Sequence, residues 1–247
     1  KKGEIDILSR NSTWTMGREA ALGLKFTSVN YYDGQGFLVA REPAVMSPLD
    51  FADVKICAQT GTTNRDNAID YLSTNNVKHA IVEVGSPDDM VKAYQDGRCN
   101  VMTADTSQLH ALQIRLAKPG AAVILPDVIS KEPLGPAVRQ DDPQWFEIVK
   151  WTHFAMLDAE ELGVSTKTLT AALASAKPDV KRLIGTDGNY GEQIGLTRDW
   201  GVRIARAAGN YGESLERNVG TFSNLGIPRG LNQLWSRGGI QYAPPVR

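Results

Sequence analysis

The side chains best suited to chemistry are hydroxyls that follow a short apolar run. In "VKICAQTGTTN", residues 54–64, the run extends from Val54 to Ala58, and a turn containing Thr62 and Thr63 leads into a helical pattern. A helix start offers unpaired backbone N–H groups and the positive end of the helix dipole, which favour an anion. Thr and Asn are also ordinary capping residues, so capping alone is an alternative. The Lys of a P-loop is missing, which excludes that motif.

A lone carboxylate stands at a second strand end. Asp105 directly follows the apolar segment "NVMTA" and precedes the helical pattern "TSQLHALQ". Ligands of open parallel sheets bind outside the carboxyl ends of the strands. A zwitterion would fit there, with its carboxylate on the N–H groups of Thr62 and Thr63 and its ammonium on Asp105. The alternative is that Asp105 simply caps its helix, and one residue can do both.

A third group of polar residues lies near the start of the chain. The segment "SRNSTWTMGRE" contains Asn11 and Thr13, and Arg18 follows them. A guanidinium just past a hydroxyl-rich loop can bind a carboxylate through two parallel hydrogen bonds. A solvated Arg at a helix start is the alternative.

Other reactive residues are scattered. His79, His110 and His153 occur singly, without metal-ligand spacing, and no nucleophile elbow is present, so we expect no catalytic site, metal or cofactor. The two cysteines, Cys57 and Cys99, could be free buried thiols or one disulfide. A bridge across this loop would stabilise the fold by on the order of 4 kcal/mol.

Composition narrows the class of protein. The 247 residues carry a net charge of −1, with 42% hydrophobic and 22% charged residues, which is typical of a globular chain and a poor match to nucleic-acid binding. The apolar runs are too short to span a bilayer. The chain begins Lys1-Lys2-Gly3 rather than with Met, and we expect it to be processed, excised or incomplete.

Strand and helix patterns alternate between residues 53 and 126. The apolar segments are 54–58, 79–84, 100–104 and 121–126, and helical patterns begin near Asn64, Ser86-Pro87 and Asp105. This alternation predicts a parallel sheet with helices on its faces. Short apolar runs near 37–39 and 136–138 flank the block, as expected of two strands crossing into and out of an inserted domain.

The rest of the chain is mostly helical. A long helix is predicted from Asp142 to Gly163, and shorter ones at 166–176, 178–184, 200–208, 213–219 and 230–237. The Pro-rich tail "GGIQYAPPVR" is expected to lie extended over the surface. Ahead of the inserted domain, "GEIDILS" predicts one strand, too little for a sheet of its own.

The whole chain resembles the periplasmic substrate-binding proteins of polar amino acid ABC transporters, and in particular their general L-amino acid-binding branch. The resemblance lies in "GEIDILSRNSTWTMGRE", "CAQTGTT", "GRCNVMTADTSQL", "SKEPLGPAVRQ" and "GLNQLWSRGGIQYAPPVR". It implies an α/β, two-lobe type II binding-protein fold that closes by hinge motion. Lobe one would comprise 1–38 and 138–247, and lobe two 39–137. Relative to the family, lobe one lacks its N-terminal segment.

The resemblance also implies residue roles. The matching ligand-binding positions are Asn11, Thr13, Arg18, Gln59, Thr62, Thr63 and Asp105. Arg18, supported by Thr13, matches the clamp for the ligand's α-carboxylate, which Thr62 and Thr63 contact from the other lobe. Asp105 matches the partner of the α-ammonium, and Asn11 and Gln59 match positions near the ligand. A cysteine pair in this branch matches Cys57 and Cys99, which favours a disulfide in an oxidising periplasm.

The function implied is non-enzymatic capture of glutamate, glutamine, aspartate or asparagine in the periplasm and delivery to an ABC transporter permease. One alternative is a truncated relative that acts as a scaffold and forms a homodimer through lobe one. Another is a lyase of the cyclohexadienyl dehydratase type on the same architecture, but the sequence offers no evident acid–base pair for it.

Overall fold

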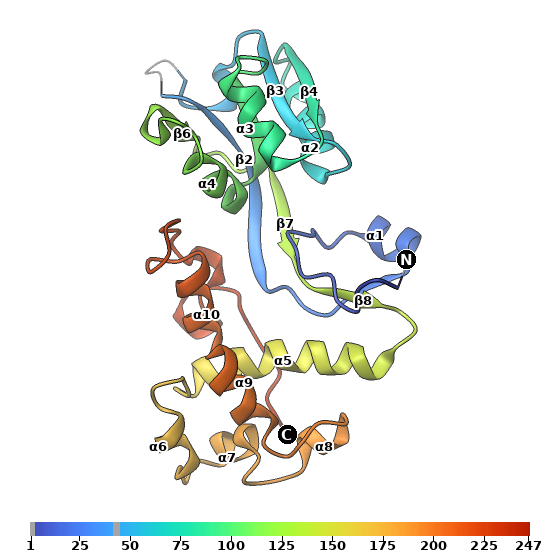
Figure 1. The fold of residues 1–247 in the computed structure, drawn as a ribbon, viewed down its shortest axis with the longest axis vertical. Helices are drawn as coiled ribbons and strands as arrows, with labels where there is room; N and C mark the ends of the chain where they lie inside the picture. The colour runs from blue at the N-terminus through green and yellow to red at the C-terminus, as the bar shows by residue number, and fades with distance from the viewer. Residues whose placement is uncertain (1–2, 42–44) are drawn as a thin grey trace. The chain divides into compact units, whose positions relative to one another are not determined.

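A computed structural model describes residues 3–41 and 45–247 and divides the chain into two compact units (Figure 1). Unit 1 combines Lys1–Tyr32 with Leu134–Arg247, and unit 2 is Asp33–Pro133. The lobe boundaries expected from the sequence, at 38/39 and 137/138, lie a few residues further along the chain. The chain enters unit 2 within strand β2 (Tyr31–Ala40) and leaves it through β7 (Ser130–Leu134).

Unit 2 is built on a mixed sheet. Its strand order is β4-β3-β5-β2-β6, with β3 (Val54–Gln59), β4 (His79–Val84), β5 (Val101–Asp105) and β6 (Ala122–Ile124). Strand β3 runs parallel to β4 and β5, but β2 is antiparallel to β5 and β6. The predicted all-parallel sheet is therefore wrong in part, because the crossing strand β2 is inserted between β5 and β6.

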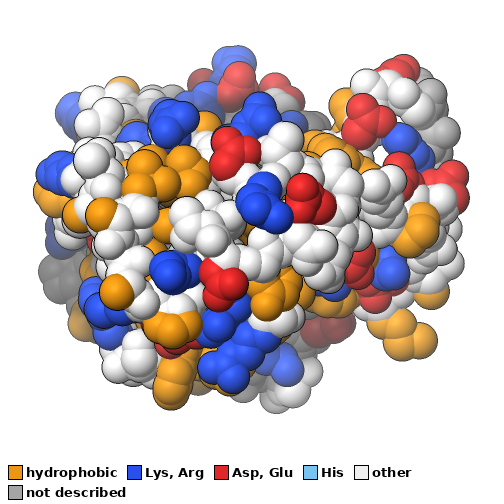
Figure 2. All heavy atoms as spheres, turned by 90° about the horizontal axis from the view of Figure 1, so that it is seen from below, with side chains coloured by type: hydrophobic (Ala, Val, Ile, Leu, Met, Phe, Trp, Pro, Cys, Tyr) orange, Lys and Arg blue, Asp and Glu red, His pale blue; other side chains and the backbone are white. Residues whose placement is uncertain are grey.

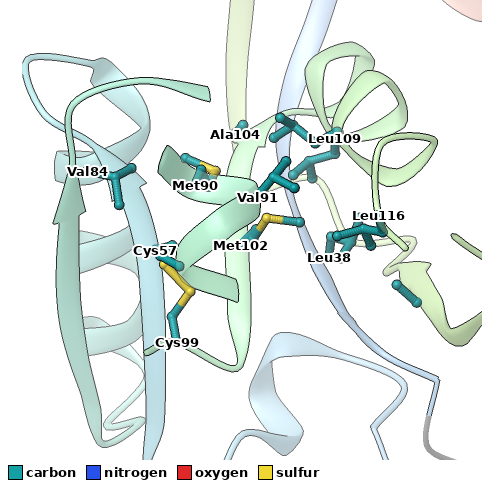
Figure 3. Close-up of a cluster of buried hydrophobic side chains, with 13 residues drawn as sticks. Leu38, Cys57, Val84, Met90, Val91, Cys99, Met102, Ala104, Leu109 and Leu116 are labelled. Atoms are coloured by element: carbon teal, nitrogen blue, oxygen red, sulfur yellow. A yellow bond between two sulfur atoms is a disulfide. The ribbon is translucent and has the colours of Figure 1, made fainter. Parts of the chain in front are cut away.

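Side chains of the sheet alternate between two helical layers. Ile56, Phe37 and Val101 pack with helix α2 (Thr63–Thr74) on one face. Their neighbours Cys57, Leu38 and Met102 point to the other face, where α3 (Pro87–Gln95) and α4 (Thr106–Gln113) cover them (Figure 3). This is the period of two that strands impose, and it places helices on both faces as the sequence predicted.

A disulfide joins Cys57 to Cys99 within the second of these layers, as the resemblance implied (Figure 3). The Cα atoms lie 5.6 Å apart, and both residues are buried. Cys57 belongs to β3, while Cys99 lies just before β5 rather than within it. The bridge thus ties together two neighbouring strands of the sheet.

Unit 1 is organised around one long helix, α5 (Pro143–Glu161), labelled in Figure 1. At the start of α5, the carboxylate of Asp142 accepts a hydrogen bond from Trp145 N at 2.8 Å. Gly163, in a left-handed conformation (φ 75°), follows the end of this helix. The helices that follow are α6 (Leu169–Leu173), α7 (Pro178–Ile184), α8 (Tyr190–Gln193), α9 (Trp200–Ala208) and α10 (Tyr211–Asn218). Short 3₁₀ turns lie at Gly230–Asn232 and Trp235–Arg237 in unit 1, and at Pro48–Asp50 and Pro119–Ala121 in unit 2.

The start of unit 1 contains little regular structure. Helix α1 (Met16–Leu22) precedes β1 (Leu24–Phe26), which pairs antiparallel with β8 (Ala137–Arg139). The strand predicted in residues 3–9 is reduced to an isolated bridge between Leu8 and Ala137. A side chain on Gly135 would collide with the carbonyl of Ser28 at 2.0 Å, so glycine is required where the returning chain passes that backbone.

Some residues of the C-terminal tail join the core of unit 1. Gln241 is 2% exposed and bridges to Leu234, and Ala243 and Val246 join hydrophobic clusters around α5. The tail is extended, as predicted, but the expectation that it lies over the surface is wrong in part, because Gln241, Ala243 and Val246 are buried while their neighbours are exposed. Charged side chains of both signs mix with hydrophobic ones over the face in Figure 2. None of the helices in the described part of the chain could cross a membrane.

Candidate functional site

Two of the predicted residues lie at one edge of the unit 2 sheet. Strands β3 and β5 are parallel neighbours, with Ile56 opposite Val101, so their carboxyl ends reach the same edge. Gln59 ends β3 and Asp105 ends β5. Gly61 takes a left-handed conformation (φ 75°), which turns the chain from β3 into α2. Ligands of such sheets bind at this edge.

Neither helix start at this edge is capped by its own side chain. Thr62 occupies the N-cap position of α2, but its hydroxyl donates to the carbonyl of Gln59 at 2.7 Å. Asp105 occupies the N-cap position of α4 without a side-chain cap bond. Its carboxylate accepts a hydrogen bond from Asn64 Nδ2 at 2.9 Å instead. Capping alone therefore does not explain why Thr and Asp stand here.

Asp105 is held by a buried amide network. The residue is 3% exposed, and Asn64, its donor, is also buried. Gln35, opposite Asp105 in the β2–β5 ladder, donates from Nε2 to the carbonyl of Asn64 at 2.7 Å and to Thr103 Oγ1 at 2.8 Å. These bonds fix the first turn of α2 against the end of β5. The carboxylate and the helix start are thus held side by side.

A second buried carboxylate supports the same turn of α2. Glu132 is 1% exposed and accepts hydrogen bonds from Thr63 Oγ1 at 3.2 Å and Asn67 Nδ2 at 2.9 Å. Ser130 donates to it at 2.6 Å. Hydrogen bonds to a charged group are stronger than neutral ones, so this carboxylate anchors the helix start firmly. Thr63 uses its hydroxyl here, and its contribution to a ligand would come from its backbone.

Acidic side chains and the positive end of a helix dipole both lie at this edge of the sheet. Asp33 accepts hydrogen bonds from the N–H groups of Gly34 at 2.8 Å and Ser107 at 3.2 Å. Burial raises the pKa of Asp33, and these hydrogen bonds oppose the rise. Together with Asp105 and Glu132 it makes the surroundings favourable for a cation, while the start of α2 favours an anion. One ligand with both charges would satisfy both.

Gln59 points toward β4 rather than toward Asp105. Its Nε2 donates weakly to the carbonyl of Gly85 at 3.5 Å. Thr60 beside it donates to Glu83. The prediction that Gln59 contacts a ligand side chain stays a prediction.

In unit 1 the predicted residues surround the start of α1. Thr15 caps the helix by accepting from the N–H of Arg18, and the Arg18 guanidinium donates to the carbonyl of Thr13 at 2.7 Å. Thr13 is 4% exposed, whereas Asn11 is exposed. The indole of Trp14 stacks on Phe26 at 5.5 Å, which fixes the loop. Arg18 is therefore a half-buried, anchored side chain rather than a solvated one.

Sequence reasoning missed the supporting residues Gln35, Asn64 and Glu132. Each left a signal. Gln35 is a polar residue between two glycines in the otherwise apolar stretch "DGQGFLVA", Asn64 directly follows the hydroxyl turn, and Glu132 lies inside "SKEPLG". A polar side chain at a buried strand position needs partners, and those partners mark the site.

Among residues 3–41 and 45–247, no group of His, Cys, Asp or Glu could hold a metal ion. His79 Nδ1 lies 2.8 Å from the carbonyl of Val77, and His153 is buried beside Phe154 and Tyr211.

Comparison with known sequences places the chain among transport proteins. It is 50% identical to a general L-amino acid-binding periplasmic protein of Rhizobium johnstonii, over 100% of this chain and 73% of the relative. It is 43% identical to a glutamate/glutamine/aspartate/asparagine-binding protein of Rhodobacter capsulatus, over 99% of this chain and 73% of the relative. A scan against models of protein families finds no match.

Solved structures agree. A periplasmic binding protein of an ABC transporter from Brucella ovis, with glutathione bound, is 44% identical and superposes with a TM-score of 0.97 over 99% of this chain and 78% of that one. An ancestral arginine-binding protein, 21% identical, shares the type II fold with a TM-score of 0.51 over 60% of this chain. The relatives are binding components of transporters and not enzymes. The chain belongs to the periplasmic substrate-binding proteins of amino acid ABC transporters.

Proposed function

We propose that this protein captures L-amino acids with acid or amide side chains, namely glutamate, glutamine, aspartate and asparagine, and delivers them to an ABC transporter permease. The observation that carries this proposal is the buried carboxylate of Asp105, held by Asn64 at the start of α2. A buried carboxylate beside a helix N-terminus suits the two charges of an amino acid head group. The relative from Rhodobacter capsulatus bears the same four ligands in its name.

In this proposal, each of the predicted residues has a role toward the head group or the side chain of the ligand. Asp105 accepts from the α-ammonium, and the backbone N–H groups at Thr62 and Thr63 donate to the α-carboxylate. Arg18, already oriented by the carbonyl of Thr13, donates to the same carboxylate, with Thr13 as its support. Asn11 and Gln59 contribute near the ligand's side chain.

The ligand's side chain is the less constrained part of the proposal. The Brucella ovis structure contains glutathione. Glutathione begins with a γ-linked glutamate whose α-ammonium and α-carboxylate are both free. A site that recognises the amino acid head group can therefore accept this tripeptide as well as glutamate, provided that the side-chain end of the site is open.

The test is titration calorimetry of the purified chain with the four amino acids, glutathione, and glutarate, which lacks the ammonium. We expect binding of at least one amino acid and none of glutarate. Asp105→Asn should abolish it, since removing one partner of a desolvated charge pair costs about 2–5 kcal/mol. Asp70→Asn is the matched control, an exposed acid on α2. Equal affinities of parent and Asp105→Asn would contradict the proposal.

We also propose that unit 1 self-associates. A groove of about 460 Å³ is lined by residues 3–8, Leu22, Leu24 and residues 137–139, and Ile5 in it is 59% exposed. Strands β1 and β8 form a sheet of two strands beside it. A second copy of the chain, related by two-fold symmetry, would cover the same apolar surface on both partners. The relatives give no support to a scaffold role without transport.

A further inference from the structure

A cavity in unit 1, remote in sequence from the predicted ligand-binding residues, combines acidic and aromatic side chains. Its volume is about 210 Å³, and it lies between α5, α7 and the C-terminal tail. The side chains that matter to the argument are Asp158, Glu161, Asp179, Trp235, Tyr242 and Arg247.

Asp158 is the unusual member. It is 8% exposed, and its Oδ2 atom has no hydrogen-bond partner within the described residues. A buried carboxylate without a donor costs several kcal/mol unless it is neutralised or paired. Glu161 already accepts from the indole nitrogen of Trp235 at 3.2 Å, and Asp179 is paired with Arg182. Asp158 Oδ2 is therefore the carboxylate oxygen in this cavity that still lacks a donor among the described residues.

The aromatic residues add a second, independent feature. Trp235 and Tyr242 form an edge-to-face pair with ring centroids 5.6 Å apart, yet they are 51% and 64% exposed. The bond to Glu161 fixes the orientation of the indole. Aromatic faces attract organic cations, and their exposure here is not explained by the packing of the core.

We propose that this cavity binds an organic cation, an ammonium or guanidinium group on a short apolar stem. The cationic head would donate to Asp158, and the stem would lie against Trp235 and Tyr242. A bare metal ion is a poor match, because the acids do not converge into a metal-binding group among the described residues. Arg247 lines the cavity too, but it forms no ion pair with these acids in the part of the chain that the structure describes.

The protonation of Asp158 offers a further readout. Burial raises its pKa to about 7, and the nearby charges of Glu161 and Asp179 add to the rise. The other charged groups facing it are Arg182 on α7 and Arg247 on the tail. A bound cation favours the carboxylate, so binding should release a proton and strengthen as the pH rises from 6 to 8.

The test is calorimetry with butylguanidinium and butylammonium chloride, run with saturating glutamate so that the amino acid site is occupied. A blocked pentapeptide with one central arginine forms a second arm, which shows whether the cation can be a protein side chain. We expect at least one cation to bind, and butan-1-ol not to bind. If glutamate does not bind, the substitutions at Asp158 and Trp235 still show whether a cation binds in this cavity.

Variants make the test specific. Asp158→Asn should weaken binding at least tenfold, and Trp235→Ala several-fold. The controls are Asp187→Asn, an exposed acid outside the cavity, and Phe222→Ala, an aromatic residue that is 86% exposed. Circular dichroism checks the fold, and Trp235→Ala, at a surface position, serves if Asp158→Asn does not fold. Absence of cation binding, or equal binding by both variants and the parent, would overturn the proposal.

Discussion

At the scale of single residues, a substitution at Arg18 distinguishes the effect of hydrogen-bond geometry on amino acid affinity from the effect of charge. Its guanidinium is oriented by the carbonyl of Thr13. Arg18→Lys keeps the positive charge but cannot form two parallel hydrogen bonds to a carboxylate. We expect amino acid affinity to fall at least tenfold, which corresponds to about 1.4 kcal/mol. Calorimetry would measure this, with Arg10→Lys as an exposed control in the same segment. Unchanged affinity would show that Arg18 does not bind the carboxylate of the ligand through two hydrogen bonds.

Asn64 tests whether Asp105 must be held in place. Asn64→Ala removes the donor to Asp105 Oδ1 but keeps the backbone carbonyl that Gln35 binds. We expect affinity to fall by about 1.5–3 kcal/mol, the range for one hydrogen bond to a charged group. Asn75→Ala is the control, because Asn75 is exposed at the far end of α2 and donates only to the carbonyl of Tyr71 among the side-chain bonds described. A larger loss of affinity in the control would refute this role.

Residue types near the site were readable from sequence, but their orientations were not. Thr62 and Asp105 stand at helix starts as predicted, and capping was an open alternative for both. The choice between capping and another role depended on Asn64 and Gln35. These two residues are distant in sequence and meet only when β2 enters the sheet between β5 and β6. Each of these residues left a local signal, but a single sequence does not show that the two residues meet.

At the scale of elements, α5 contains two buried groups that respond to pH in opposite directions. Burial lowers the pKa of His153 to about 4, and both its ring nitrogens lack partners within the described residues. The unfolded chain protonates this residue below about 6.5. Its contribution to stability is therefore lost as the pH falls from about 6.5 to 4.

Asp158 has the reverse effect, because its folded-state pKa is raised to about 7 from 3.8. Its contribution is present at low pH and is lost as the pH rises through this range. In Asp158→Asn the His153 effect remains, so stability should rise with pH between 4.5 and 6.5. In His153→Leu stability should fall with pH. Each slope is at most about 1.4 kcal/mol per pH unit, measured from urea midpoints. Parallel slopes in the two variants would contradict this assignment.

The disulfide is a covalent cross-link within unit 2. Replacing Cys57 and Cys99 together by Ala should lower the free energy of unfolding by on the order of 4 kcal/mol, since the closed loop spans 42 residues. Denaturant unfolding of the variant and of the parent, with and without reductant, measures this. Reductant should destabilise the parent and leave the variant unchanged. A variant as stable as the oxidised parent would show that the bridge is dispensable.

Elements with strong local signals were predicted well. The start of α3 at Ser86-Pro87 and the start of α5 at Asp142 follow from capping residues, and β3, β4 and β5 follow from apolar runs. The strand predicted near residues 3–9 failed, because Leu8 alone finds a bridging partner there. The extended tail was predicted, but the burial of Ala243 and Val246 was not, since packing with α5 is a tertiary effect that local sequence does not encode.

At the scale of the whole molecule, self-association is the prediction to test. Ile5 and Ile7 are 59% and 36% exposed in the groove of unit 1. Light scattering of the purified chain at several concentrations should show a dimer. Ile5→Lys should shift the population to monomer, whereas Met46→Lys, at a residue that is 68% exposed in unit 2, should not. A monomer at every concentration would disprove the dimer.

The position of the disulfide also affects what happens when the backbone is cut. Helix α2, strand β4 and helix α3 all lie in the loop that Cys57 and Cys99 close. A protease that cleaves once anywhere within this loop produces two pieces that remain covalently attached. The helix start at Thr62 and the strand that ends at Asp105 therefore stay on one connected molecule after a single nick, as long as the surroundings remain oxidising. A single cleavage in this loop therefore does not release a fragment of unit 2.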